Sequence, residues 1–315
     1  MVIFFATLKS VAVLMGIGII GFWVLAKRIV PLDVLKVLTP LVLEVALPCM
    51  IFYNIITKFS PEKMPNWWTL PLWWAAMAGL FLALSLLGML YIDKKNRGEV
   101  GISLFYPNAT FFPLGIIPFI YGPDSSLLIE LFLFTLFFPL LVFNGYIFFF
   151  RSKKATYKFS LKDSKIFNRV LLATLFSVFL KLTDMDVYVP NFVVEITGIV
   201  GATALPLLML TIGGNVFIDF TRRGKFNYLA STKFVLTKNI LFPAAMLLFL
   251  ILIRPPESVA NLMMLQSVVP PLSAVPVLTA RAKGNVSISN QFLISSFICS
   301  IVTIPVCLWC FSVYY

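Results

Sequence analysis

Two proline-rich stretches within apolar sequence decide how this chain folds. Residues 106–118 read YPNATFFPLGIIP, and residues 266–276 read QSVVPPLSAVP. Each proline removes a backbone hydrogen-bond donor, and its ring clashes with the carbonyl four residues earlier. Because three prolines fall within about a dozen residues in each stretch, both are expected to break a helix. The sequence therefore predicts two interrupted helices.

The sequence around these stretches is that of a membrane protein. Of its 315 residues, 60% are hydrophobic and only 12% are charged, about half the charged share of a typical soluble domain. A soluble chain of this length has no core large enough for so much apolar surface. Several apolar runs have the length of a membrane helix and lack the short alternation of barrel strands. Because the bilayer core holds no water to satisfy the backbone, we expect these runs to be helical.

We expect an all-α polytopic membrane protein with ten transmembrane helices. The predicted spans are residues 2–26, 35–57, 67–91, 101–121, 125–150, 167–183, 190–217, 228–253, 257–280 and 286–313. A basic connection, residues 151–166, separates the first five spans (residues 1–150) from the last five (residues 167–315).

The basic residues orient the predicted helices. Most of the 25 lysines and arginines lie in connections that follow odd-numbered spans, whereas the connections after even-numbered spans hold only Lys58, Lys63, Lys181 and Arg254. Cytoplasmic loops carry this excess of positive charge. We therefore expect a cell-membrane protein with both termini outside and the basic loops in the cytoplasm. There the net charge of +12 meets anionic lipid headgroups, and no nucleic acid is needed to explain it.

The two halves of the sequence repeat each other. Three pairs of prolines share an offset of 158 residues: Pro48 with Pro206, Pro113 with Pro271, and Pro118 with Pro276. A shared offset in corresponding spans indicates an internal duplication. A repeat of five spans starts on one side of the membrane and ends on the other, so its second copy is inverted. Inverted repeats of this kind are an architecture of secondary transporters.

Interrupted spans at corresponding positions of two halves indicate a binding site near the middle of the membrane. Backbone groups freed at that depth are tolerated only against protein or a polar cavity. The new helix N-termini would also direct positive dipole ends at an anion. The polar side chains in position to assist are Asn108, Thr110, Gln266 and Ser273. The alternative is that the prolines only kink two spans for packing.

Ionisable residues within the predicted spans need a polar environment, because a charge at the bilayer centre costs at least about 2.5–3.5 kcal/mol. Glu44 has two open roles: it carries a coupling proton or helps to hold a cation, or it is a structural partner of a lysine or a freed amide. Lys238 either attracts an anionic substrate or pairs with a carbonyl of span 257–280. Glu130 and Glu195 lie nearer the outer ends of their spans, where we expect them to snorkel to the interface.

Several short motifs follow one another in a specific order along nearly the whole chain. They are Leu47-Pro48 with Phe52 and Asn54, Asn108 five residues before Pro113, Ala204-Leu205-Pro206-Leu207 followed by Ile212-Gly213-Gly214, Lys238 five residues before Pro243, and the proline-rich stretch that leads to Ala280-Arg281. In this order and spacing the sequence resembles the auxin efflux carrier family. The resemblance implies two inverted five-helix repeats, as in bile-acid-type sodium symporters, with broken helices 4 and 9 that cross near the midplane.

The family resemblance also implies a function. It implies an elevator-type transporter of small organic anions such as auxin, malate or malonate, usually a homodimer, in which helices 1, 2, 6 and 7 form the scaffold. Asn108 and the Pro113 region would line one side of the pocket, with Pro270 and Pro271 opposite. The chain departs from the family at Thr110, where glycine is frequent, and at Gln266, which takes the place of an asparagine that would mirror Asn108.

Other functional classes fit the sequence less well. The chain has no histidine, so it lacks the usual general base and metal ligand, and its aspartates lie in loops or at span ends; we do not expect an enzyme, a metal site or a cofactor. A channel is a second alternative, because broken helices also line pores. A sodium-coupled symporter is the third, and it would draw oxygen ligands from Glu44, Asn54, Asn215 and Gln266. The coupling ion is thus a proton or sodium, if there is one.

Overall fold

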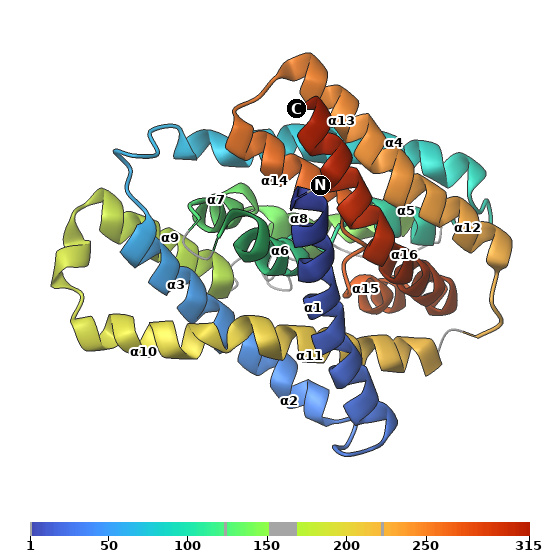
Figure 1. Cartoon of the computed structure of the whole chain (residues 1–315). Coiled ribbons are helices and arrows are strands. Elements are labelled where there is room, and N and C mark those ends of the chain that lie inside the picture. Colours follow the sequence, from blue (N-terminus) through green and yellow to red (C-terminus); the bar gives the residue numbers. More distant parts are fainter. Residues whose placement is uncertain (1, 123–124, 151–168, 222–223) are drawn as a thin grey trace.

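The computed structural model describes residues 2–122, 125–150, 169–221 and 224–315 (Figure 1). The described chain is a set of helices joined by short turns, and it contains no β-strand beyond one isolated bridge between Pro107 and Pro271. The basic connection predicted at 151–166 lies outside the described residues.

Among the described residues, six helical stretches are long and apolar enough to cross a membrane. They are α1 (Val2–Ala26); α2 (Val34–Leu41), continued by the π turn η1 (Val42–Ala46) and α3 (Leu47–Lys58); η2 (Trp67–Thr69) with α4 (Leu70–Tyr91); α10 (Asn191–Ala202) with α11 (Ala204–Thr221); α12 (Tyr228–Leu236), continued by the π turn η5 (Thr237–Leu241) and α13 (Phe242–Ile253); and α16 (Val286–Tyr314). They coincide with the first, second, third, seventh, eighth and tenth predicted spans.

The other four predicted spans form shorter or interrupted helices. They are α5 (Arg97–Phe105) with α6 (Phe111–Tyr121); α7 (Leu127–Phe134), α8 (Phe138–Gly145) and η3 (Tyr146–Phe150); α9 (Arg169–Leu182), followed by η4 (Met185–Tyr188); and α14 (Glu257–Val268) with α15 (Val275–Arg281). The interruptions predicted from the prolines in the fourth and ninth spans are therefore confirmed.

The fifth predicted span, residues 125–150, is not the single helix that we expected. Residues 135–137 form a turn between α7 and α8, and the Thr135 hydroxyl donates a hydrogen bond to Leu131 O at 2.7 Å. Pro139 is the second residue of α8 and cannot donate to the carbonyl of Thr135. One proline in a uniformly apolar run was too weak a signal to predict this break.

Two of the membrane-length helices widen into a π turn directly before a proline. Pro48 and Pro243 cannot donate to the carbonyls four residues earlier, which belong to Glu44 and Asn239. Around these carbonyls the α-helix widens into the π turns η1 and η5. Single π turns within α-helices often accompany functional sites, and the two ionisable residues singled out in the sequence, Glu44 and Lys238, lie in them.

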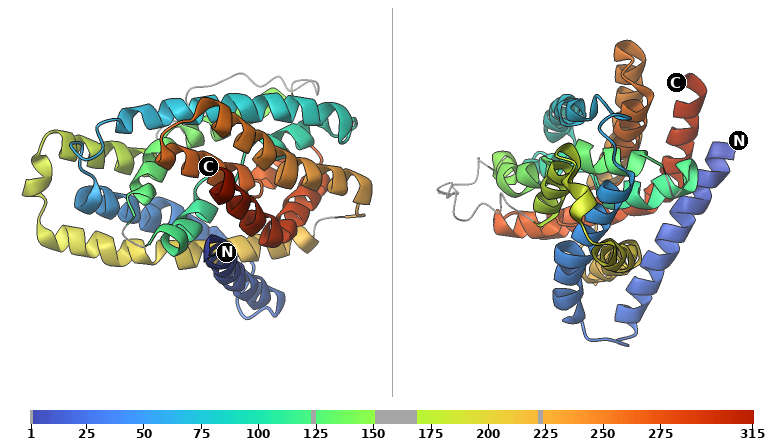
Figure 2. Two further views of the ribbon diagram at one scale, coloured as in Figure 1. Left: turned by 45° about the horizontal axis from the view of Figure 1, so that its top comes forward. Right: turned by 90° about the vertical axis from the view of Figure 1, so that its left-hand side faces the viewer.

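The two helices α1 and α11 approach each other backbone to backbone. A methyl group on Gly213 would overlap the main chain of Gly18, and one on Gly21 would overlap the main chain of Leu210. Because small residues let membrane helices approach closely, these glycines fix where α1 and α11 cross. On its other side α1 runs beside α16 (Figure 2).

Polar contacts gather at the turns that follow three odd-numbered spans. The Asn285 backbone N–H donates to Glu99 Oε1 at 2.6 Å, and its side-chain amide donates to Asn96 Oδ1 at 3.2 Å. Near the start of α16, Gln291 Nε2 donates to Lys225 O at 2.9 Å. The first two bonds join the turn after the ninth predicted span to the turn after the third and the start of α5, and the last bond holds the turn after the seventh span against the start of α16. These three odd-numbered spans therefore end at the same end of the molecule.

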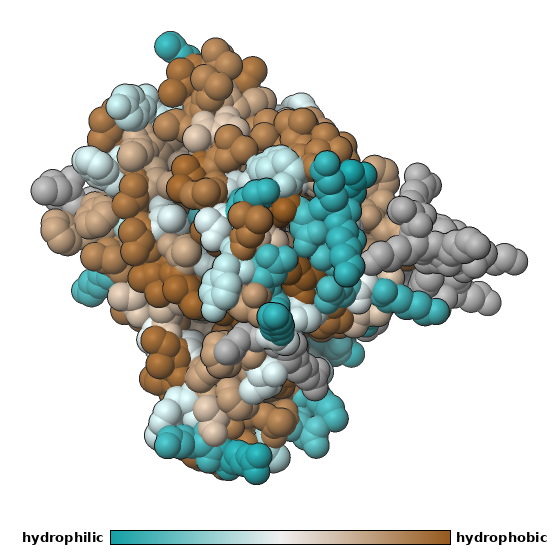
Figure 3. Space-filling view, turned by 90° about the vertical axis from the view of Figure 1, so that its right-hand side faces the viewer, coloured by the Kyte–Doolittle hydropathy of each residue, from teal (hydrophilic) through white to brown (hydrophobic). Residues whose placement is uncertain are grey.

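The surface of the chain is largely apolar. Figure 3 shows hydrophobic residues over much of one face, with hydrophilic residues gathered near its centre and at the tip of the α1–α2 turn at the bottom. Apolar side chains such as Ile199, Leu252 and Tyr188 are more than two-thirds exposed. A largely apolar exterior of this kind is what a bilayer requires.

Candidate functional site

The two interrupted helices meet at their breaks, which we call the crossover (residues 106–110 and 269–274). The segment after α5 and the segment after α14 run antiparallel for a few residues. Asn108 N donates to Pro270 O, and Leu272 N donates to Tyr106 O, both at 2.8 Å. The prolines cannot donate, so their neighbours form the two backbone bonds that close the crossover.

A buried amide side chain adds a third bond. Gln266 is fully buried in the last turn of α14, and its Nε2 donates to Ala109 O at 2.6 Å. Asn108 is only 1% exposed. The side-chain oxygens of both residues, Asn108 Oδ1 and Gln266 Oε1, have no hydrogen-bond partner. Since a buried oxygen without a partner costs about 1–3 kcal/mol, the crossover holds polar groups that the chain itself does not satisfy.

The other predicted residues of the two proline-rich stretches lie in the crossover or close to it in sequence. Pro113, Pro270 and Pro271 are buried, whereas Thr110 and Ser273 are partly exposed. Thr110 directly precedes α6 and makes no side-chain cap, so the α6 N-terminus keeps its positive dipole end uncapped by that residue. Six of the seven residues predicted in these stretches thus lie in the crossover or bond to it, and Pro113 lies three residues further on, in α6.

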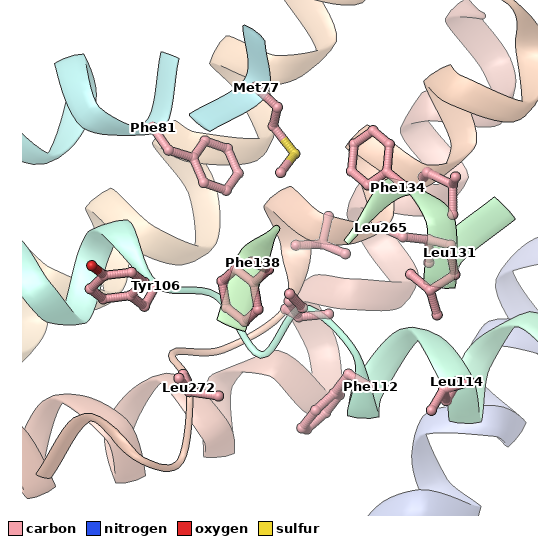
Figure 4. Close-up of a cluster of buried hydrophobic side chains, with 14 of the residues drawn as sticks. Met77, Phe81, Tyr106, Phe112, Leu114, Leu131, Phe134, Phe138, Leu265 and Leu272 are labelled. Carbon is pink, nitrogen blue, oxygen red and sulfur yellow. The ribbon is translucent and has the colours of Figure 1, made fainter. Parts of the chain in front are cut away.

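Apolar side chains enclose the crossover. Figure 4 shows Met77 and Phe81 on one side of the crossing segments and Phe112 and Leu272 on the other. A void of about 10 Å³ lies beside Tyr106, which is room for one water molecule at most. Its lining consists of Trp74, Met77, Ala78, Phe81, Phe105, Tyr106, Pro107, Phe138 and Leu141. The crossover is therefore closed in this conformation.

Lys238 lies in η5 and is 1% exposed. Its Nζ is 4.8 Å from the ring centroid of Phe242 and 5.2 Å from that of Phe81, and it has no hydrogen-bond partner. The pairing with a carbonyl of span 257–280 that the sequence left open is therefore not formed. Phe81 also lines the void beside the crossover, so Lys238 and that void contact the same aromatic side chain.

Sequence reasoning missed the residue that holds η5 in place. Asn239 Nδ2 donates to Ser296 O at 3.2 Å and Thr303 Oγ1 at 3.1 Å, and Asn239 Oδ1 accepts from Ser296 Oγ at 2.7 Å. These bonds fasten η5 to α16. The signal in the sequence was the position of this asparagine. It lies four residues before Pro243, so its carbonyl lacks the usual helical N–H donor.

Glu44 is a surface ion-pair partner in the described chain. Its Oε2 is 2.7 Å from Arg169 Nη1, and the two side chains are 46% and 61% exposed. This favours the structural role, with an arginine in place of the expected lysine or amide. Glu130 is buried and accepts a bond from Ser126 Oγ at 3.2 Å, so the expectation that it snorkels was wrong; Glu195 is exposed.

Within the described chain, no hydrogen bond links Asn54 to the crossover. It is buried on α3, and its Nδ2 donates to Met50 O, one turn earlier in the same helix, at 2.8 Å.

An apolar helical exterior, six membrane-length helices and two broken helices that bond at their breaks define a polytopic membrane protein of the kind that moves solutes. The sequence model of the membrane transport proteins matches residues 6–308, and the chain belongs to this family, which is the auxin efflux carrier family. No curated protein matches the sequence.

Proposed function

We propose that the protein is a secondary transporter or facilitator that moves small organic anions, auxin-like acids or dicarboxylates, across the cell membrane. The observation that carries the proposal is the crossover with its unsatisfied amide oxygens, its partly exposed hydroxyls and the N-terminus of α6. Asn108, Thr110, Gln266 and Ser273 would orient the anion, and the helix dipole would stabilise its charge.

Lys238 supports an anionic substrate. A buried ammonium group without a hydrogen-bond partner is costly in a membrane protein, so such a residue is normally retained for function. Because the Phe81 ring contacts both Lys238 and the void beside the crossover, Lys238 would lower the electrostatic cost of bringing an anion into the apolar interior.

We further propose a ten-helix topology of two inverted five-helix repeats, residues 1–150 and 167–315, with both termini outside and the basic loops in the cytoplasm. Two contacts support this arrangement: the turn after the ninth span bonds to the turn after the third and the start of α5, and the turn after the seventh span bonds to the start of α16. All three turns would be cytoplasmic. The matched breaks in the fourth and ninth spans support the inverted repeat.

An elevator mechanism fits the packing around the crossover. The α1–α11 crossing is fixed by backbone contact at glycines, which suits a scaffold. The second half of the broken fourth span, α6, packs on α1 through Gly115, whose carbonyl accepts a bond from Ser10 Oγ at 3.2 Å. At this contact α6 presents a glycine to the Leu14 side chain of α1, and a contact with so little interlocking suits movement of α6 along α1. The exposed apolar face of α10, with Phe192, Ile196 and Ile199, is available for the homodimer that the family resemblance implies.

A sodium-coupled symporter on the same fold is the second candidate. It is favoured by the two amide oxygens at the crossover, Asn108 Oδ1 and Gln266 Oε1, which have no partner. Hard cations are held by oxygen ligands of this type.

The test is uptake of labelled auxin, malate and malonate into proteoliposomes, with imposed proton or sodium gradients. We expect saturable uptake that Asn108→Ala reduces at least ten-fold (about 1.4 kcal/mol). Asn144→Ala is the matched control, because Asn144 Nδ2 donates to Leu140 O, one turn earlier in the same helix. Equal uptake by the two variants would place the pocket elsewhere, and linear, non-saturating flux would indicate a channel.

A further inference from the structure

A groove lies along the last turns of α4. Ala83, Leu86, Leu87 and Leu90 follow the spacing i, i+3, i+4 and i+7 and so share one face of the helix. Together with Met89 and Arg97 they line a groove of about 480 Å³. Leu86, Leu87 and Leu90 are all more than two-fifths exposed.

The groove is apolar along its length and positively charged at one end. Arg97, the first residue of α5, closes it, and Lys94 and Lys95 are exposed in the same turn. The carboxylate of Asp93 is already engaged, since it accepts bonds from the backbone N–H of Lys95 and from Asn96. Within the described chain, no carboxylate pairs with the Arg97 guanidinium.

The dimensions fit one lipid chain. From Ala83 to Leu90 the helix rises about 10 Å, which is most of the thickness of one leaflet in a hydrocarbon core of about 30 Å. The cationic turn then lies at the level of the phosphates. A second protein chain fits less well, because a stable interface buries about 800 Å² on each partner and this groove is one helix face wide.

We propose that this groove is a binding site for an anionic phospholipid, with one acyl chain along Leu86, Leu87 and Leu90 and the phosphate group bound by Arg97. Arginine presents a planar fork of donors that matches phosphate oxygens. The proposal depends on α4 crossing the membrane and is independent of what the protein transports.

Native mass spectrometry of the purified full-length chain tests the proposal, with phosphatidylglycerol and phosphatidylcholine of identical acyl chains added in equal amounts. We expect the native chain to bind phosphatidylglycerol preferentially and Arg97→Gln to lower that preference about five-fold. Lys36→Gln is the matched control, because Lys36 is also exposed and basic but is already paired with Asp33 at 2.6 Å.

A second measurement, fluorescence quenching, tests where on the protein the lipid binds. In a Leu87→Trp chain, brominated phosphatidylglycerol should quench the added tryptophan more than brominated phosphatidylcholine does, and adding Arg97→Gln should remove the difference. The proposal is overturned if the native chain binds both lipids equally, if Arg97→Gln behaves like Lys36→Gln, or if Arg97→Gln dissociates a dimer, which would assign the groove to a second copy.

Discussion

Replacement of Lys238 by methionine should make the protein more stable and less active. The ammonium group is buried without a hydrogen-bond partner, which costs about 3 kcal/mol at membrane depth. The rings of Phe81 and Phe242, 5.2 and 4.8 Å away, return about 1–2 kcal/mol through cation–π attraction. Methionine has a similar shape and carries no charge, so Lys238→Met should gain about 1–2 kcal/mol.

That gain corresponds to a rise in Tm of roughly 2–8 °C if about 2–4 °C accompanies each kcal/mol. The measurement is thermal unfolding in detergent, followed by anion uptake in proteoliposomes. The matched control is Lys233→Met, because Lys233 Nζ donates to Tyr91 O at the C-terminus of α4 at 3.3 Å and its loss should not stabilise the protein. A lower Tm for Lys238→Met would show that the charge is satisfied, and unchanged uptake would show that Lys238 serves no transport step.

Three further predictions concern the crossover and the helix contacts. Gln266→Leu removes the bond to Ala109 O and should cost about 1–3 kcal/mol in detergent unfolding while lowering uptake, whereas equal stability would mean that water replaces the amide. Asn239→Ala should destabilise the protein by about 2–3 kcal/mol in the same unfolding assay, and in a Lys238→Met background it should cause no further loss of uptake. Gly213→Ala should prevent recovery of folded protein, measured by size-exclusion chromatography, because the added methyl group would overlap backbone atoms of α1. Gly16→Ala is the control and should be neutral, because there is open space around Gly16.

The sequence predicted the fold where a single physical effect dominates. Apolar runs long enough to cross the bilayer predicted the membrane helices, because no other structure satisfies the backbone there. Clustered prolines predicted the breaks at 106–110 and 269–274, because each stretch loses three backbone donors within about a dozen residues. The single Pro139 did not allow the same prediction, because neither its neighbours nor its spacing shows whether a proline only kinks a helix or ends it in a turn.

The contents of the candidate site were less predictable. Asn108 and Gln266 were found because they share the two broken stretches, so their proximity follows from the breaks. Asn239 was missed because its partners, Ser296 and Thr303, are about sixty residues away in α16. The burial of Glu130 was missed for a similar reason: its position near a helix end is local, whereas its burial depends on how α7 packs against α4 and α6.

The crossover has a consequence for how the protein is made. Gln266 and Ala109, which it joins, are 157 residues apart. At a synthesis rate of about 5–20 residues per second, the first break waits roughly 8–30 s for the segment that satisfies it. During that interval the nascent chain has unpaired peptide groups in or beside the bilayer, so the first half of the protein should depend on the insertion machinery or on a lipid-embedded chaperone until the second half arrives.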